Sequence, residues 1–234
     1  MPHIDHARKE LRFKIVYCGA GLSGKTTNLE LIHKRTRADR RGKLIVMPGA
    51  NERTVFFDLL PVEAGRYKDY DVRVHLCTVP GQAEYAQLRQ TVLRNVDGVV
   101  LVVDCQHGRT AGNRSAIKDL EQNLELLGHE PAKLPTVVQW NKRDLAGPNG
   151  VERMRTALKI PPGVVQVVAS AKCGEGVFET LKAVLKECLS VIAQPSLAPP
   201  GHLPSIIPGR RDSLYPPAPP PPPQRAQKLS SSRV

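Results

Sequence analysis

Residues 19–26 read Gly-Ala-Gly-Leu-Ser-Gly-Lys-Thr and fit the pattern G-x-x-x-x-G-K-[ST], which is typical of phosphate-binding loops. The loop lies between an apolar segment and an amphipathic one, so it is predicted to join a strand to a helix. The glycines let successive N–H groups turn toward an anion, and the helix start adds partial positive charge. Lys25 is then expected to bridge the β- and γ-phosphates, and Thr26 to ligate Mg²⁺. The pattern predicts a nucleoside triphosphate site formed by Gly19, Ala20, Gly21, Leu22, Ser23, Gly24, Lys25, Thr26 and Thr27.

A second motif, Asn141-Lys142-Arg143-Asp144, follows an apolar run and predicts the choice of base. The Asp144 carboxylate can accept two hydrogen bonds from guanine, whereas adenine has no donors there and would leave a desolvated charge unpaired. Lys142 would lay its aliphatic stem along the base, and Asn141 would steady the phosphate loop. Ser170-Ala171-Lys172 follows the next predicted strand and is expected to offer a backbone N–H to guanine O6. If the match at 141–144 is accidental, the alternative is an enzyme that uses ATP.

Hydrolysis of the triphosphate needs a positioned water and compensation for the charge that develops on the transferred phosphate. Gly81 can offer its N–H to a γ-phosphate, and Gln82 beside it can orient the attacking water. Earlier in the chain, Thr54 can complete the Mg²⁺ shell when a γ-phosphate is present. Arg53 is placed to act as an arginine finger supplied in cis, and an ordinary surface arginine is the alternative.

The elements that must position these residues follow an alternating pattern. Short runs rich in valine and isoleucine are typical of parallel strands covered on both faces, and the amphipathic segments between them are typical of helices. Predicted strands lie at 13–18, 72–79, 99–103, 136–140 and 164–169, with edge strands from 43–47 and 54–62, and predicted helices lie at 25–38, 84–94, 110–128, 151–159 and 176–193. The pattern predicts a three-layer α/β sandwich that binds its ligands at the carboxyl ends of the strands.

The chain changes character near residue 194. Twelve of its 21 prolines lie from Pro195 onward, in a stretch with few large apolar residues. Such a composition cannot bury enough surface to offset the entropy of ordering a chain. We therefore predict a domain at 1–194 and a Pro-rich disordered tail at 195–234, which is either a spacer or a ligand for a proline-recognition groove.

Composition excludes several classes of protein. The 234 residues carry a formal charge of +12, and no apolar run approaches the roughly 20 residues that cross a bilayer. The five cysteines are widely spaced and mostly apolar in context, so we expect buried reduced thiols in a cytoplasmic protein without an integral membrane span. The histidines show no metal spacing, and His75 is expected to be a core or edge residue. Without a basic face interleaved with aromatic residues, no nucleic-acid partner is predicted.

Taken together, these motifs resemble those of the Ras-like small GTPases, and within them the bacterial MglA group of polarity and gliding-motility switches. The resemblance covers roughly residues 10–192. It is carried by Lys14-Ile15-Val16-Tyr17, Gly24-Lys25-Thr26-Thr27-Asn28-Leu29, Arg53-Thr54-Val55-Phe56-Phe57-Asp58, Thr78-Val79-Pro80-Gly81-Gln82, Val96-Asp97-Gly98-Val99-Val100, Asn141-Lys142-Arg143-Asp144-Leu145 and the segment 176–184.

The resemblance implies a P-loop GTPase domain (G domain) that binds GTP, GDP and Mg²⁺ and hydrolyses GTP slowly without an activating protein. It implies Arg53 and Gln82 as catalytic residues, and a roadblock-type, MglB-like activating protein that donates no arginine. It also implies effector proteins that read the GTP state, a monomer, and recruitment to a cell pole.

One departure from the Ras-like pattern concerns the metal. Most Ras-like proteins carry Asp-x-x-Gly at the end of the second strand, where this chain has Thr78-Val79-Pro80-Gly81. MglA proteins share the threonine, so the difference supports that group. It also favours the alternative of a GTP-loaded scaffold with little hydrolysis. Two further features are compatible with a paralogue that has a different partner. These are Ala20, at a position where MglA-like loops usually have proline, and the added tail.

Overall fold

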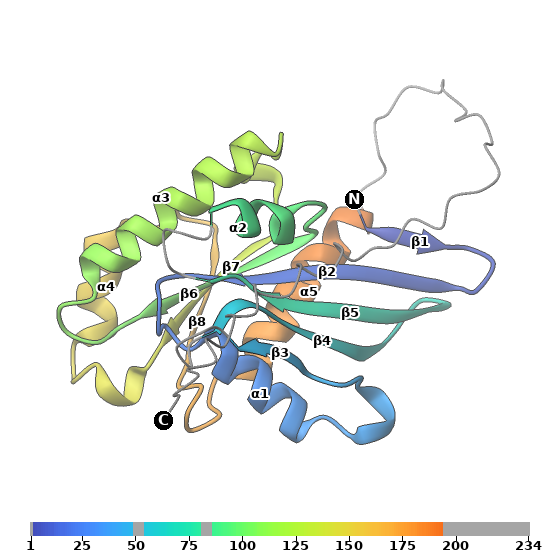
Figure 1. Ribbon diagram of the computed structural model, residues 1–234, viewed down its shortest axis with the longest axis horizontal. Helices are drawn as coiled ribbons and strands as arrows, with labels where there is room; N and C mark the ends of the chain where they lie inside the picture. The colour runs from blue at the N-terminus through green and yellow to red at the C-terminus, as the bar shows by residue number, and fades with distance from the viewer. Residues whose placement is uncertain (1, 49–53, 81–85, 194–234) are drawn as a thin grey trace, which may run out of the picture. The chain divides into compact units, whose positions relative to one another are not determined.

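A mixed, mostly parallel sheet of eight strands forms the centre of the chain (Figure 1). The computed structural model describes residues 2–48, 54–80 and 86–193. The strands are β1 (His3–Asp5), β2 (Glu10–Cys18), β3 (Ile45–Pro48), β4 (Thr54–Tyr67), β5 (Tyr70–Thr78), β6 (Gly98–Asp104), β7 (Thr136–Asn141) and β8 (Val165–Val168). The helices are α1 (Lys25–Arg35), α2 (Ala86–Leu93), α3 (Thr110–Leu126), α4 (Gly150–Leu158) and α5 (Val177–Ala193).

The strands lie in the order β3-β4-β5-β2-β6-β7-β8. From β5 to β8 neighbouring strands are parallel, whereas β4 is antiparallel to both β3 and β5. Strand β2 therefore lies centrally, and its residues 15–18 pair with β6 while residues 10–12 pair antiparallel with β1. Parallel strands end at one edge of a sheet, so the segments after β2, β5, β6, β7 and β8 converge there.

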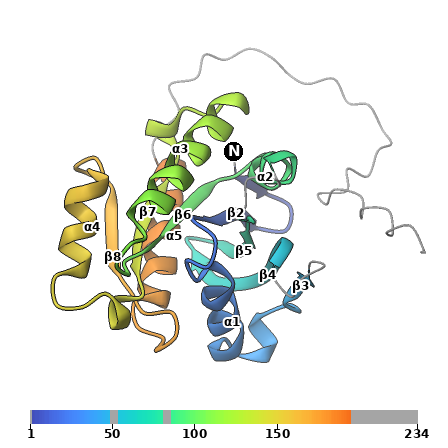
Figure 2. The same cartoon turned by 60° about the vertical axis from the view of Figure 1, so that its left-hand side comes forward.

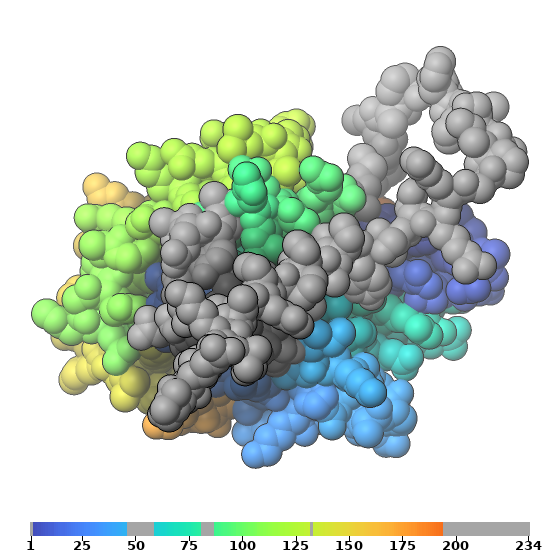
Figure 3. All heavy atoms as spheres, in the orientation of Figure 1, coloured from blue at the N-terminus to red at the C-terminus, as the bar shows by residue number. Residues whose placement is uncertain are grey.

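Helices cover both faces of the sheet (Figure 2). Leu29 and Ile32 of α1 and Leu181 and Val184 of α5 pack in one core cluster, and residues of α2, α3 and α4 pack in the other. Every residue of β6 is buried, because this strand is covered on both sides, which explains the apolar sequence of its residues 98–103. Helices α2 and α3 lie side by side on the outer surface (Figure 3).

The fold class predicted from the sequence is confirmed, and most predicted elements lie within a few residues of their observed bounds. The helix predicted at 25–38 ends at Arg35, because Thr36 adopts an extended conformation and a short 3-10 turn follows at Ala38–Arg40. Strand β4 continues to Tyr67 rather than ending at 62, since its backbone keeps pairing with β5 through a bulge near Gly65. Strand β1 was not predicted. The predicted tail lies outside the described residues.

Candidate functional site

The phosphate loop joins β2 to α1, as its sequence predicts, and its backbone has the conformation that its glycines allow. Gly19 and Gly24 have φ values of 138° and 100°, and Leu22 is left-handed at 64°. A Cβ at Gly19 would lie 2.2 Å from the carbonyl oxygen of Val102, so only glycine fits there. Lys25 is 8% exposed, and its Nζ donates to the carbonyl oxygens of Gly19 and Ala20 at 3.0 and 2.9 Å. The lysine thus lies folded back over the loop.

A cavity of about 680 Å³ opens beside this loop. Its lining includes the whole phosphate loop and Thr27, the end of β5 at Thr78 to Pro80, and residues of α2 and α3. The first residues of α1, Lys25 to Thr27, line the same cavity, and the partial positive charge at the start of a helix suits an anion there. Cys18 also lines the cavity, and burial raises the pKa of its thiol to about 12, so it is protonated at neutral pH.

The amide of Asn141 connects the loops after β2, β7 and β8. Its Nδ2 donates to the carbonyl oxygen of Ser23 at 2.7 Å, and its Oδ1 accepts from the backbone N–H of Ala171 at 2.9 Å. The side chain is 1% exposed, so both bonds are shielded from water. The predicted phosphate loop and the predicted guanine loop at 170–172 are therefore held to each other by one side chain.

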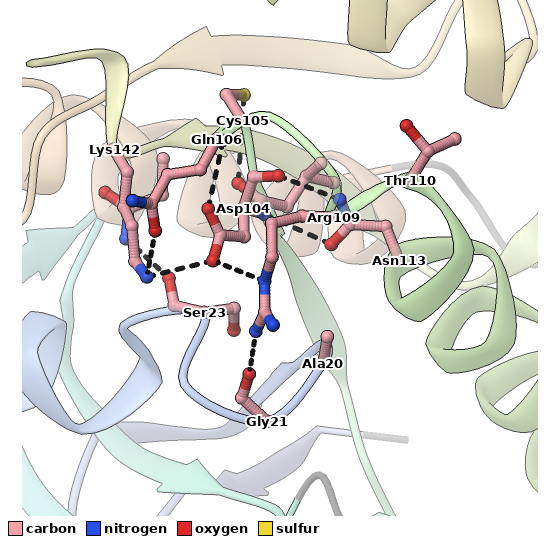
Figure 4. A network of polar contacts seen from close by, with 12 residues as sticks. Ala20, Gly21, Ser23, Asp104, Cys105, Gln106, Arg109, Thr110, Asn113 and Lys142 are labelled. Atoms are coloured by element: carbon pink, nitrogen blue, oxygen red, sulfur yellow. Dashed lines mark hydrogen bonds and ion pairs between the residues drawn. The ribbon is translucent and has the colours of Figure 1, made fainter. Parts of the chain in front are cut away.

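Figure 4 shows a second connection, built around the Asp104 carboxylate at the end of β6. Asp104 is fully buried, and its Oδ2 accepts from Lys142 Nζ at 2.9 Å and from Arg109 Nε at 3.1 Å. Arg109, just before α3, also donates from Nη2 to the carbonyl oxygen of Gly21 at 2.7 Å. Lys142 has a left-handed backbone with φ 61° and also donates to Gln106. Sequence reasoning missed Asp104 and Arg109; a charged residue ending an apolar strand was the available signal.

Several predicted residues surround these contacts. Asp144 lies in a 3-10 turn at Arg143–Leu145 and is exposed, which leaves its carboxylate accessible to a base. Ser170 and Ala171 are buried and Lys172 is exposed, in the turn after β8. Thr54 begins β4, but its side chain, like Arg53, Gly81 and Gln82, lies outside the described residues.

The residues present suit a magnesium ion that is carried largely by phosphates. Mg²⁺ usually keeps several waters and takes only one or two protein ligands besides substrate phosphates. Thr26 supplies a hydroxyl where the phosphate loop enters α1 and lines the cavity, and the buried Thr78 lines it from β5. In the described part of the chain, no cluster of three His, Cys, Asp or Glu side chains could hold a metal ion.

Arg89 of α2 and Asp119 of α3 form an ion pair that also lines this cavity. Arg89 Nη2 donates to Asp119 Oδ1 at 3.0 Å, and the arginine side chain is 7% exposed. Asp119 is thereby engaged with Arg89, so Thr26 remains the better candidate for the metal.

None of the helices in the described ranges combines the length and the apolar character that a membrane span requires.

Comparison with known proteins identifies the family of this arrangement. Residues 12–190 match the model of the elongation factor Tu GTP binding domain. The chain is 44% identical over 190 residues to the mutual gliding-motility protein MglA of Myxococcus xanthus, which covers 81% of this chain and 97% of that protein. It is also 26% identical over 201 residues to elongation factor 4 of Sorangium cellulosum, covering 84% of this chain and 30% of that longer protein.

Proposed function

This chain belongs to the MglA-type GTPases, and on that basis we propose that it is a molecular switch that hydrolyses GTP to GDP and phosphate. The observation that carries the proposal is the joint anchoring of two loops by Asn141, which bonds Ser23 of the phosphate loop and Ala171 of the guanine loop. A base and a triphosphate bound to these loops would be held in one fixed relation.

The chain's own residues have distinct roles in this proposal. The amides of 19–26 and the start of α1 bind the phosphates, and Lys25 turns from the loop carbonyls toward the β- and γ-phosphates. Asp144 accepts two hydrogen bonds from guanine, and Lys142 lies along the base. The turn formed by Ser170, Ala171 and Lys172 lies beside guanine O6. When bound, Mg²⁺ neutralises charge on the phosphates, and Thr26 and Thr54 would hold it.

For the hydrolytic step, we assign Gln82 to orient the attacking water, Gly81 to offer its N–H to the γ-phosphate, and Arg53 to reach the transferred phosphate in cis. An arginine in this role accelerates hydrolysis by about 10³–10⁵-fold. The loops that carry these residues need an ordering partner, for which a roadblock-type, MglB-like activating protein is the proposed candidate. The intrinsic rate would then be slow.

The test compares Arg53→Ala and Gln82→Leu with the unaltered protein in single-turnover GTP hydrolysis, with and without the roadblock-type protein. Both variants should bind GTP normally and lose most of the stimulated turnover. A normal stimulated rate in Arg53→Ala would remove that residue from the mechanism. Competition between ATP and labelled GTP, with GTP expected to win, separates this function from that of an ATP-using enzyme.

Thr78 favours a second candidate, a GTP-loaded scaffold with little hydrolysis. This residue is fully buried at the cavity, where most Ras-like proteins place a carboxylate, and a hydroxyl binds a divalent cation more weakly. Under this reading the single-turnover rate stays low even with excess activating protein, and the protein remains loaded with GTP.

The process that the switch controls is proposed from the relative that is named for gliding motility. We propose control of cell polarity or motility by a cytoplasmic monomer that is recruited to a cell pole and binds effectors in its GTP state. Fluorescence microscopy of fusions of the unaltered protein and of Gln82→Leu tests this. The fraction of the protein that lies at the cell pole should differ between the two.

A further inference from the structure

Three polar side chains lie in the core between α1, β7 and α5, and nucleotide chemistry does not account for them. Asn28, Gln139 and Thr180 are each fully buried. Gln139 interrupts the apolar sequence of β7 two residues before Asn141, so both side chains point to the same face of the sheet. Burying three polar groups is costly unless all of them are hydrogen-bonded, so each of these side chains needs a partner inside the core.

The amides of Asn28 and Gln139 pair with each other. Asn28 Nδ2 donates to Gln139 Oε1 at 2.9 Å, and Gln139 Nε2 donates back to Asn28 Oδ1 at 2.9 Å. The second hydrogen of each amide is also used: Asn28 Nδ2 donates to the carbonyl oxygen of Gly24 at 2.8 Å, and Gln139 Nε2 donates to Thr180 Oγ1 at 3.0 Å. All four amide hydrogens therefore have acceptors, so the pair has one strongly preferred arrangement.

This pair ends on the phosphate loop. Gly24 is the residue that caps α1, and its φ of 100° orients the first N–H groups of that helix. Its carbonyl oxygen accepts from both the backbone N–H and the side chain of Asn28. The neighbouring Ser23 carbonyl is held by Asn141, so two consecutive peptides of the loop are tied to β7.

We propose that Asn28 and Gln139 are positioning residues for the nucleotide. They hold Gly24, and with it the anion-binding end of α1, at a fixed place relative to the strand that carries the guanine motif. The inference rests on the proposed nucleotide site and adds a second tie, inside the core, to the one made by Asn141. Neither side chain is required to touch the nucleotide.

The experiment separates positioning from core stability. Asn28→Leu combined with Gln139→Met replaces both amides by apolar groups of similar size, a change that can be nearly neutral for folding when both partners are removed. We expect a thermal midpoint without nucleotide close to that of the unaltered protein, since a midpoint in GDP would itself depend on nucleotide affinity. Release of fluorescent GDP should be about tenfold faster, as loss of one net hydrogen bond to Gly24 predicts.

Thr180→Val is the matched control, because it perturbs the same buried cluster at the end away from Gly24. It should lower the thermal midpoint, since it leaves a Gln139 hydrogen unpaired, and change GDP release less than about twofold. Release rates that follow the thermal midpoints across these variants, or an unchanged rate in the double variant, would overturn the proposal.

If the double variant does not accumulate as folded protein, Gln139→Met alone is compared with Thr180→Val. Both lose a buried partner, but only the former detaches Asn28 from β7, so only it should release GDP faster. Equal release rates in the two would also overturn the proposal. Failure of the unaltered protein to take up GDP would instead refute the proposed function.

Discussion

Replacing Arg109 by alanine should speed GDP release about tenfold without unfolding the domain. Arg109 donates to the carbonyl oxygen of Gly21 at 2.7 Å and to the buried Asp104 at 3.1 Å. Hydrogen bonds to charged groups contribute about 1.5–3 kcal/mol. The side chain is 38% exposed, so solvent screening reduces this to about 1–1.5 kcal/mol. Because about 1.4 kcal/mol is tenfold in an equilibrium constant, a five- to twelvefold effect is expected if the loss appears in dissociation.

The assay is a stopped-flow chase of fluorescent GDP by excess unlabelled GDP in the presence of Mg²⁺. Arg114→Ala is the control, because Arg114 lies in α3, which begins directly after Arg109, and donates to the carbonyl oxygen of Ala157 at 2.8 Å, away from the phosphate loop. Arg109→Lys keeps the charge but not the two-pronged geometry, so its rate should be intermediate. A rate for Arg109→Ala within twofold of the unaltered protein, or one matched by Arg114→Ala, would refute the reasoning.

Three further outcomes are expected. Asp144→Asn should weaken GDP binding by about a hundredfold or more, since guanine loses its carboxylate acceptor. In a competition assay the variant should bind xanthosine diphosphate better than the unaltered protein does. An unchanged purine preference would contradict the role of Asp144. Iodoacetamide at pH 8 should alkylate the exposed Cys173 well before Cys18, whose buried thiol has a pKa raised to about 12, and peptide mass spectrometry measures the order. Burial lowers the pKa of His75 below its ordinary 6.5, so the unfolded chain binds that proton more tightly and the folded protein loses stability as the pH drops below about 6.5. Urea unfolding should show that His75→Gln loses less stability between pH 7 and 5.5 than the unaltered protein does. Equal losses of stability in the two proteins would exclude this cause.

The parts of this molecule that sequence could predict are those with short-range signals. The phosphate loop has a fixed spacing and a strand–loop–helix context, and the buried strands are rich in apolar residues. The three residues of β1 carry no such signal: they form a strand only because residues 10–12 of β2 offer a pairing edge. The end of β4 is similar, since residues 63–67 have no apolar run and stay in the strand through pairing with β5, by backbone register and by the ion pairs of Glu63 with Arg73 and Arg66 with Asp71.

The contacts that organise the site could not be predicted from local sequence, because they join residues that are far apart in the chain. Arg109 meets Gly21 across 88 positions, and Asn28 meets Gln139 across 111. One clue was present, because an amide within the apolar sequence of β7 requires a buried partner. The sequence offers no means of identifying that partner as Asn28, since its place on α1 relative to β7 is set by how the helix packs on the sheet.

The short β1 strand has a practical consequence for handling this protein. Residues 10–12 of β2 extend beyond the reach of β6, and β1 occupies the backbone donors and acceptors that they present on that side. Unpaired strand edges recruit other chains. Removing the first six residues, or fusing a rigid tag directly before His3, would bare this stretch and invite association between molecules, so a carrier domain is better joined through a long spacer.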